Sequence, residues 1–186
     1  MAPSPNDLNA AIATTRFGLG ARQGEIALAG RRPRDHLKDQ IRRNGADLPP
    51  GDRETTGQRL VEFRAYRQDI AQARAMTAEG GAAADPVKGA QNLIRENTGG
   101  DSLARTRLAI ATEAGFRERW ALFWANHFTV SATKAQVATL VGPFEAEAVR
   151  PHVFGPFADL LAAVETHPAM LLYLDQAQSI GPNSPA

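Results

Sequence analysis

The stretch that most constrains the fold is WALFWANHFTVS, residues 120–131. Its large ring-bearing side chains recur at intervals of three and four residues, on one face of a single helix. They are Trp120, Phe123, Trp124, His127 and Phe128. Aromatic rings bury large apolar areas, so this spacing predicts the main core helix of the protein.

His127 lies inside this aromatic face, and two interpretations of it remain open. In the first, it is a core histidine whose ring nitrogens bond to a backbone carbonyl or a nearby carboxylate. In the second, it is a desolvated imidazole that acts as a metal ligand or a general base. The second interpretation lacks support from the sequence nearby, because no metal-ligating or acidic partner lies four residues from His127 on the same helix.

The composition of the rest of the chain indicates an all-α protein. Ala and Leu together number 50 of the 186 residues, whereas Val and Ile number 15, which favours helix over sheet. No segment alternates apolar and polar residues between hairpin turns. We expect residues 1–186 to form one helical domain, an irregular array of about seven to nine helices with no sheet.

Helical periodicity and turn residues divide the chain into segments. A long helix is expected from about residues 52–56, with Leu60, Phe63 and Ile70 facing inward. A mobile internal loop is expected at 77–86, where the sequence is TAEGGAAADP. Further helices are expected at 87–97, closed by Gly99 and Gly100, and then at 103–110, 116–128, 138–149, 156–165 and 168–178.

Several classes of protein are excluded or disfavoured. The chain has no cysteine, which excludes disulfide scaffolds, thiolate metal sites and a cysteine nucleophile. A net charge of +1 gives no electrostatic reason to expect nucleic acid as a partner. No apolar run is long enough for a transmembrane segment. Residues 1–7 show no secretory signal, so the default expectation is a cytoplasmic protein.

The candidate site residues lie in the aromatic-rich second half of the chain. Three histidines and two carboxylates could together form a metal or catalytic site, namely His127, His152, His167, Glu145 and Asp175. None of them shows the close pairing of a His-Glu-x-x-His helix. His152 and His167 lie at predicted helix boundaries, where their ring nitrogens could instead bond to free backbone groups. The sequence identifies no cofactor.

Five blocks of sequence resemble one family. They are RFGLG at 16–20, FWANHFTVS at 123–131, Glu145 with RPH at 150–152, HPAMLLYLD at 167–175, and GPNSP at 181–185. Through these blocks the chain resembles the N-terminal part of the large bacterial group called domain of unknown function 1800. The Phe-Trp-x-Asn-His-Phe and His-Pro-x-Met-Leu-x-Tyr-Leu-Asp blocks are the most specific, and the resemblance is weak between 44 and 98.

The resemblance implies an all-helical fold and a function that is not established in the family. It also implies that residues 1–186 are the N-terminal portion of a longer domain, because family members run beyond twice this length. In those members, an Asn-Glu-Asn-x-Ala-Arg-Glu helix follows shortly after the Pro-Asn-Ser-Pro-Ala loop. Many members carry an export signal, so export is the alternative to a cytoplasmic location.

Two functional hypotheses follow. The first is a helical interaction or scaffold module without a complete catalytic site, whose aromatic half packs on its own C-terminal region or on a protein partner. The second is a metal-assisted, envelope-associated hydrolase or oxidase, with a histidine-rich site completed by residues beyond 186. If the domain is longer than this chain, we expect exposed apolar side chains around 120–128 or 168–178.

Overall fold

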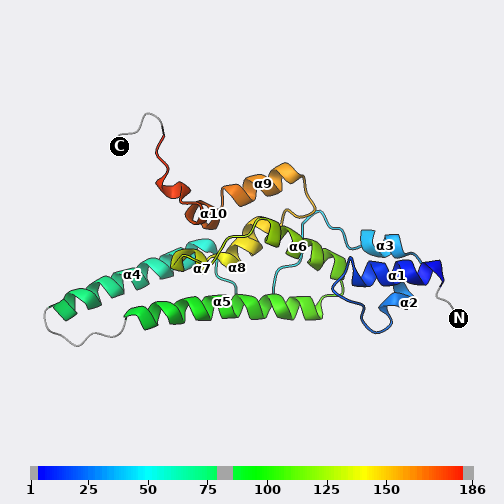
Figure 1. Ribbon diagram of the computed structural model, residues 1–186, viewed down its shortest axis with the longest axis horizontal. Helices are drawn as coiled ribbons and strands as arrows, with labels where there is room; N and C mark the ends of the chain where they lie inside the picture. Colours follow the sequence, from blue (N-terminus) through cyan, green and yellow to red (C-terminus); the bar gives the residue numbers. More distant parts are fainter. Residues whose placement is uncertain (1–3, 79–85, 182–186) are drawn as a thin grey trace.

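The protein is all-α in the computed structural model, which describes residues 4–78 and 86–181 (Figure 1). These residues form ten α-helices, one π-helical turn and one 3-10 turn, and no strand occurs among them. The all-α prediction is confirmed. The mobile loop predicted at 77–86 lies largely outside the described residues. Of this segment only the ends are described: Thr77 and Ala78 close one helix and Pro86 opens the next.

Three short helices form one end of the molecule (Figure 1). They are α1 (Pro5–Thr15), α2 (Glu25–Ala29) and α3 (Pro33–Lys38). Helix α1 begins with a capping box, in which the Ser4 side chain accepts from the Asp7 amide and the Asp7 carboxylate accepts from the Ser4 amide. Helix α1 contacts both α2 and α3, and it also touches the later helix α6.

Two long helices, α4 (Thr56–Ala78) and α5 (Pro86–Ala111), lie side by side and extend toward the other end (Figure 1). The predicted inward stripe of α4 is confirmed in part: Phe63 is buried, while Leu60 and Ile70 are half-buried. The predicted break at Gly99 and Gly100 is wrong, because α5 runs through both glycines without interruption.

A glycine within a helix costs only about 1 kcal/mol, so neighbouring contacts can outweigh it. Here the next residue, Asp101, is held by Arg59 of α4 with N–O distances of 2.9 and 3.1 Å. This contact ties α5 to α4 directly beyond the two glycines. The packing between the two helices therefore keeps the backbone helical where the local sequence predicts an end.

The second half of the chain supplies the central helices. They are α6 (Gly115–His127), α7 (Ala135–Ala138), α8 (Val141–Phe144), the π-turn η1 (Glu145–Val149), α9 (Phe157–Glu165), α10 (Pro168–Tyr173) and the 3-10 turn η2 (Gln176–Gln178). The single helix predicted at 138–149 is thus divided between the end of α7 and the continuous pair α8 and η1. Helix α10 begins at Pro168, as its sequence predicts.

The hydrophobic core lies between α6, η1, α9 and α10. Its buried members come mainly from residues 121–170 and include Ala121, Val137, Leu140, Phe144, Val149, Leu160, Val164 and Met170. Most of these side chains are small or aliphatic, as an alanine-rich composition requires. Among the described helices, none combines the length and the apolar character needed to cross a membrane.

Candidate functional site

Six ring-bearing side chains from two helices form a continuous group, which we call the aromatic surface. They are Trp120, Phe123, Trp124, His127 and Phe128 at and just after α6, and Phe157 at the start of α9. Trp120 and Phe123 stack with their ring centroids 5.2 Å apart and their planes 9° apart. Phe157 lies 5.8 Å from Trp124 and 6.3 Å from Phe128, so it connects α9 to α6.

The aromatic surface is only partly exposed, and the prediction that the rings of α6 form the core is confirmed in part, since Trp120, Trp124 and Phe128 pack against the core and Phe123 does not. Phe123 is 51% exposed and Phe157 is 55% exposed. Trp120, Trp124 and Phe128 are half-buried against the core. The ring of His127 lies on the exposed edge, 6.2 Å from Phe123 in a stacked arrangement. His127 is therefore not a core histidine.

The side of α6 next to these rings is also buried, and it carries charge. Its members are Arg117, Glu118 and the small residue Ala121. Glu118 is 2% exposed and accepts two hydrogen bonds from the fully buried Arg150, at 2.8 and 2.7 Å. Arg117 donates to Gln40 O at 2.7 Å and to Asp47 at 2.9 Å. These partners hold the charged side chains of α6 inside the protein, while Phe123 stays exposed.

Arg150 is the centre of this buried network. Besides Glu118, it contacts Glu145 at 2.6 and 2.8 Å and donates to Asp47 O at 2.7 Å. Burial by itself would lower the pKa of Arg150, but the hydrogen bonds and charges of Glu118 and Glu145 outweigh this effect and raise the pKa above its ordinary value. The guanidinium is thus a permanent positive charge that anchors α6 to η1.

The π-turn η1 carries two carboxylates into different surroundings. Glu145 pairs with Arg150 and also with Arg105 of α5, at 3.2 Å. Glu147 accepts from the Thr56 amide at 2.8 Å and lies 3.2 Å from Nε2 of His167. Single π-turns within helices often occur at functional sites. Here the turn directs one carboxylate to α5 and the other to the start of α4.

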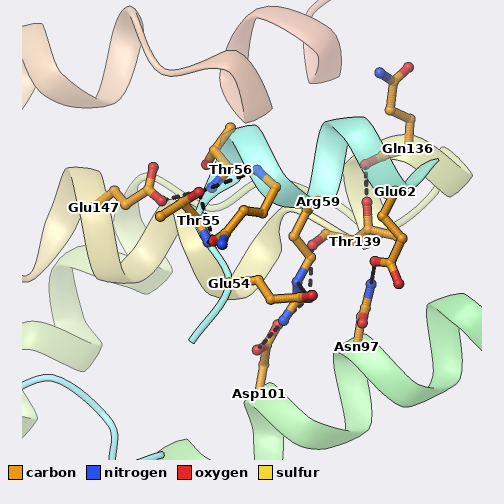
Figure 2. Close-up of polar contacts among 11 residues, drawn as sticks. Glu54, Thr55, Thr56, Arg59, Glu62, Asn97, Asp101, Gln136, Thr139 and Glu147 are labelled. Atoms are coloured by element: carbon orange, nitrogen blue, oxygen red, sulfur yellow. Dashed lines mark hydrogen bonds and ion pairs between the residues drawn. The ribbon is translucent and has the colours of Figure 1, made fainter. Parts of the chain in front are cut away.

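Figure 2 shows the polar contacts around the start of α4, where Thr56 meets Glu147. One turn later, Arg59 binds Asp101 of α5 and donates to Thr139 O at 3.0 Å. Its Nε also lies 2.8 Å from Glu54, without the alignment of a hydrogen bond. The buried Arg59 thus joins α4, α5 and the segment after α7 through charge-assisted contacts.

His167 is buried and its hydrogen bonds define which nitrogen carries the proton. Nδ1 accepts from the Ala169 amide at 3.1 Å, which caps α10. In the neutral ring the proton is therefore on Nε2, which lies 3.0 Å from the Thr56 hydroxyl and 3.2 Å from Glu147. A general base needs a free lone pair, and here the lone pair is occupied by a backbone amide. This arrangement makes His167 a structural link.

The other candidate residues have separate partners. Nδ1 of His152 lies 3.0 Å from Ala148 O, so its ring contacts the helix that precedes it. Asp175 pairs with Lys134 at 2.6 Å, and Lys134 also donates to two carbonyls at the end of α10. Over residues 4–78 and 86–181, no three His, Asp or Glu side chains are grouped closely enough to hold a metal ion.

The environment of His167 gives a testable pH dependence. Burial lowers the pKa of His167 below its ordinary value, and the hydrogen bond and charge of Glu147 oppose this shift without cancelling it. A histidine with a lowered pKa in the folded state stabilises the fold above its unfolded pKa of about 6.5, and this contribution is lost as the pH falls. Protonation would also place an N–H on Nδ1, opposite the Ala169 amide.

We therefore expect the free energy of unfolding to fall between about pH 7.5 and pH 5, and this fall to be smaller in His167→Asn than in the wild type. Urea denaturation at the two pH values measures the difference. The matched control is His127→Asn, because His127 is exposed and takes no part in the cap of α10. Equal pH dependence in the wild type and His167→Asn would contradict this account of the α10 cap.

The sequence indicates some of these residues and not others. His167, His152, Arg150 and Glu145 belong to blocks that the sequence singles out, whereas Glu118, Thr56 and Arg59 do not. One sequence pattern could have predicted that Glu118 is buried: it lies on the same helical face as two small residues, Ala121 and Ala125. A charged residue aligned with small residues on one face, next to aromatic rings, indicates that the charged side packs against a partner.

Comparison with known proteins gives one match. The family model described as "Protein of unknown function (DUF1800)" matches residues 12–184, which is nearly the whole chain. No curated protein matches. No solved structure matches either.

Proposed function

Since the chain belongs to the family described as "Protein of unknown function (DUF1800)", whose description assigns no activity, we propose a function from the surface of the molecule itself. The protein is a helical interaction module, and its aromatic surface binds an apolar helical segment. The observation that carries this proposal is the exposure of Phe123 and Phe157 at 51% and 55% within one stacked group of rings.

The composition of the aromatic surface suits binding. Isolated exposed apolar residues are ordinary, but contiguous apolar patches mark interaction sites. Tryptophan and other aromatic residues are also enriched among the residues that dominate binding energy. A helix that places apolar side chains on one face would cover several of these rings at once. This supports a helical segment as the ligand.

The aromatic surface is also held rigidly, which reduces the entropic cost of binding. Beneath it, Arg150 and Arg117 fix the buried face of α6 through charge-assisted hydrogen bonds. On its side, the Trp120 indole donates to Val153 O at 2.7 Å. The stacked and edge-on ring contacts restrict the remaining side chains. The rings are therefore positioned before a partner arrives.

We further propose that the bound segment belongs to the same polypeptide, so that residues 1–186 act as the N-terminal portion of a longer helical domain. The exposed leucines at the end of the chain support an extended apolar contact. Leu171 and Leu174 lie in and just after α10 and are both exposed.

Tryptophan fluorescence tests the proposal, because the only two tryptophans of the chain, Trp120 and Trp124, both lie in the aromatic surface. We expect a leucine-faced amphipathic helical peptide to bind and shift their emission to shorter wavelength. Phe123→Ala or Phe157→Ala should weaken this binding by at least about tenfold, the loss typical of a central aromatic residue. Val61→Ala is the matched control, since Val61 is an exposed apolar residue of α4 outside the aromatic surface.

Two outcomes would separate the parts of this proposal. Equal binding by the wild type, Phe123→Ala and Phe157→Ala would overturn the aromatic surface as the binding site. The source of the segment is tested by acrylamide quenching of the two tryptophans in a polypeptide that continues past Ala186. Lower quenching than in residues 1–186 supports a segment of the same chain, whereas equal quenching assigns the segment to another protein.

A further inference from the structure

A cleft of ≈ 260 Å³ lies between α5, the segment 141–150 and the loop that precedes α4. Its walls are formed largely by small or apolar residues, including Ala104, Ala132, Val141, Pro143 and Ala146. None of the residues that line it belongs to the aromatic surface. The cleft is therefore a separate feature of the molecule, with its own chemistry. Ligand sites typically combine apolar walls of this kind with a few polar groups that fix orientation.

Each carboxylate that lines the cleft pairs with an arginine of the protein. Glu54 and Asp101 both pair with the buried Arg59, at 2.8 and 2.9 Å. Glu145 pairs with the buried Arg150 at 2.6 Å. These carboxylates have their positive partners within the protein itself. Because Glu54 and Asp101 share one arginine, some negative charge remains beside the cleft and disfavours a doubly charged anion.

Two guanidinium groups that line the cleft retain unused hydrogen-bond donors. Arg105 is 45% exposed and pairs with Glu145 through Nε at 3.2 Å, and its two terminal nitrogens donate no hydrogen bond to any described residue. Arg53 is exposed and donates through one terminal nitrogen to Pro49 O. The polar groups of the cleft that remain available to a ligand are thus N–H donors on two positively charged side chains. Such groups bind carboxylates and phosphates.

We propose that this cleft binds a small organic monocarboxylate with an apolar body. The carboxylate is held by Arg105, with Arg53 beside it, and the apolar body lies against Ala132, Val141 and Ala146. A monocarboxylate fits better than a phosphate, because the three lining carboxylates repel a second negative charge. The small volume restricts the body to a single ring or a short chain.

Benzoate and its neutral isostere benzamide are suitable probes, measured by calorimetry or ligand-observed NMR on the wild-type chain. We expect benzoate to bind with roughly millimolar affinity, as is usual for a ligand of this size, and benzamide to bind at least about tenfold more weakly. Arg105→Gln should reduce benzoate affinity by at least about tenfold, since the charge-assisted contact is lost. Arg107→Gln is the matched control, because Arg107 lies on the same helix and does not line the cleft.

Two further variants keep the test interpretable. Ala132→Leu fills the cleft and should reduce binding of both probes, with thermal unfolding used to check that the variant is folded. Phe123→Ala should leave benzoate binding unchanged, so the outcome is independent of the aromatic surface. Equal affinity for benzoate and benzamide, or unchanged benzoate affinity in Arg105→Gln, would overturn the proposal. Absence of saturable benzoate binding to the wild type would overturn it as well.

Discussion

Glu118→Ala is expected to lower the free energy of unfolding by about 3–5 kcal/mol, the cost of breaking a buried ion pair by removing one partner. Arg150 is fully buried. Glu118 accepts a hydrogen bond from each of the two terminal nitrogens of Arg150, at 2.7 and 2.8 Å. Without Glu118, the guanidinium keeps Glu145 and Asp47 O but loses half of its charged partners. A charge that cannot reach water is then left partly uncompensated.

Urea denaturation of the wild type and Glu118→Ala measures this loss. Glu113→Ala is the matched control, because Glu113 is exposed just before α6 and has no ion pair among the described residues. We expect a change of less than about 0.5 kcal/mol in that control. The double variant Glu118→Leu with Arg150→Met should recover part of the loss, since replacing a buried pair by apolar residues is often neutral. A loss below about 1 kcal/mol in Glu118→Ala would contradict the anchoring role of the pair.

Gly45→Ala is the second change with a large expected effect. Gly45 has a φ of +82°, a conformation that costs a residue with a side chain about 1–2 kcal/mol. A Cβ at this position would also overlap the backbone of Arg150 and Pro151, lying 2.6 Å from Pro151 Cα. Overpacking of this kind adds about 1–3 kcal/mol. The neighbouring Ala46 amide donates to Arg150 O at 2.8 Å, so the two backbones cannot separate freely.

Gly51→Ala separates the two contributions to this effect. Gly51 has a φ of +105° and no atom near the position of a Cβ, so only the conformational cost applies there. Thermal or urea unfolding of the two variants should therefore show a clearly larger loss for Gly45→Ala. Equal losses in the two variants would mean that the segment at 45 can move away from Arg150, and that the contact between this loop and the residues after η1 is not a fixed part of the fold.

Much of the architecture can be predicted from local sequence. The excess of Ala and Leu over Val and Ile indicates an all-α fold, and the spacing of Leu60, Phe63 and Ile70 places the inward side of α4 correctly. The continuity of α5 could not be predicted in this way. Gly99 and Gly100 favour a helix end locally, and the contact that overrides them joins Asp101 to Arg59, 42 residues earlier.

The orientation of α6 is the clearest limit of the sequence. Hydrophobic spacing alone places Trp120, Phe123 and Trp124 inward, because aromatic rings are usually buried more readily than charges. Trp120 and Trp124 do pack against the core, but Phe123 is exposed, and Arg150, 32 residues from Glu118, makes that charged residue buried as well. A pairing over that distance leaves no periodic pattern in the sequence. The same limit applies to the histidines, whose partners depend on which helices meet.

The central claim is that buried charged residues fix α6 and that its partly exposed aromatic rings, with Phe157, bind a helical segment. NMR spectra of the amide and indole N–H groups, recorded while a leucine-faced helical peptide is added, test this claim most directly. We predict that the largest shifts fall on the amides of α6 and α9, with little change at α2 and α3. Shifts centred on other helices, with α6 and α9 unchanged, would contradict the account.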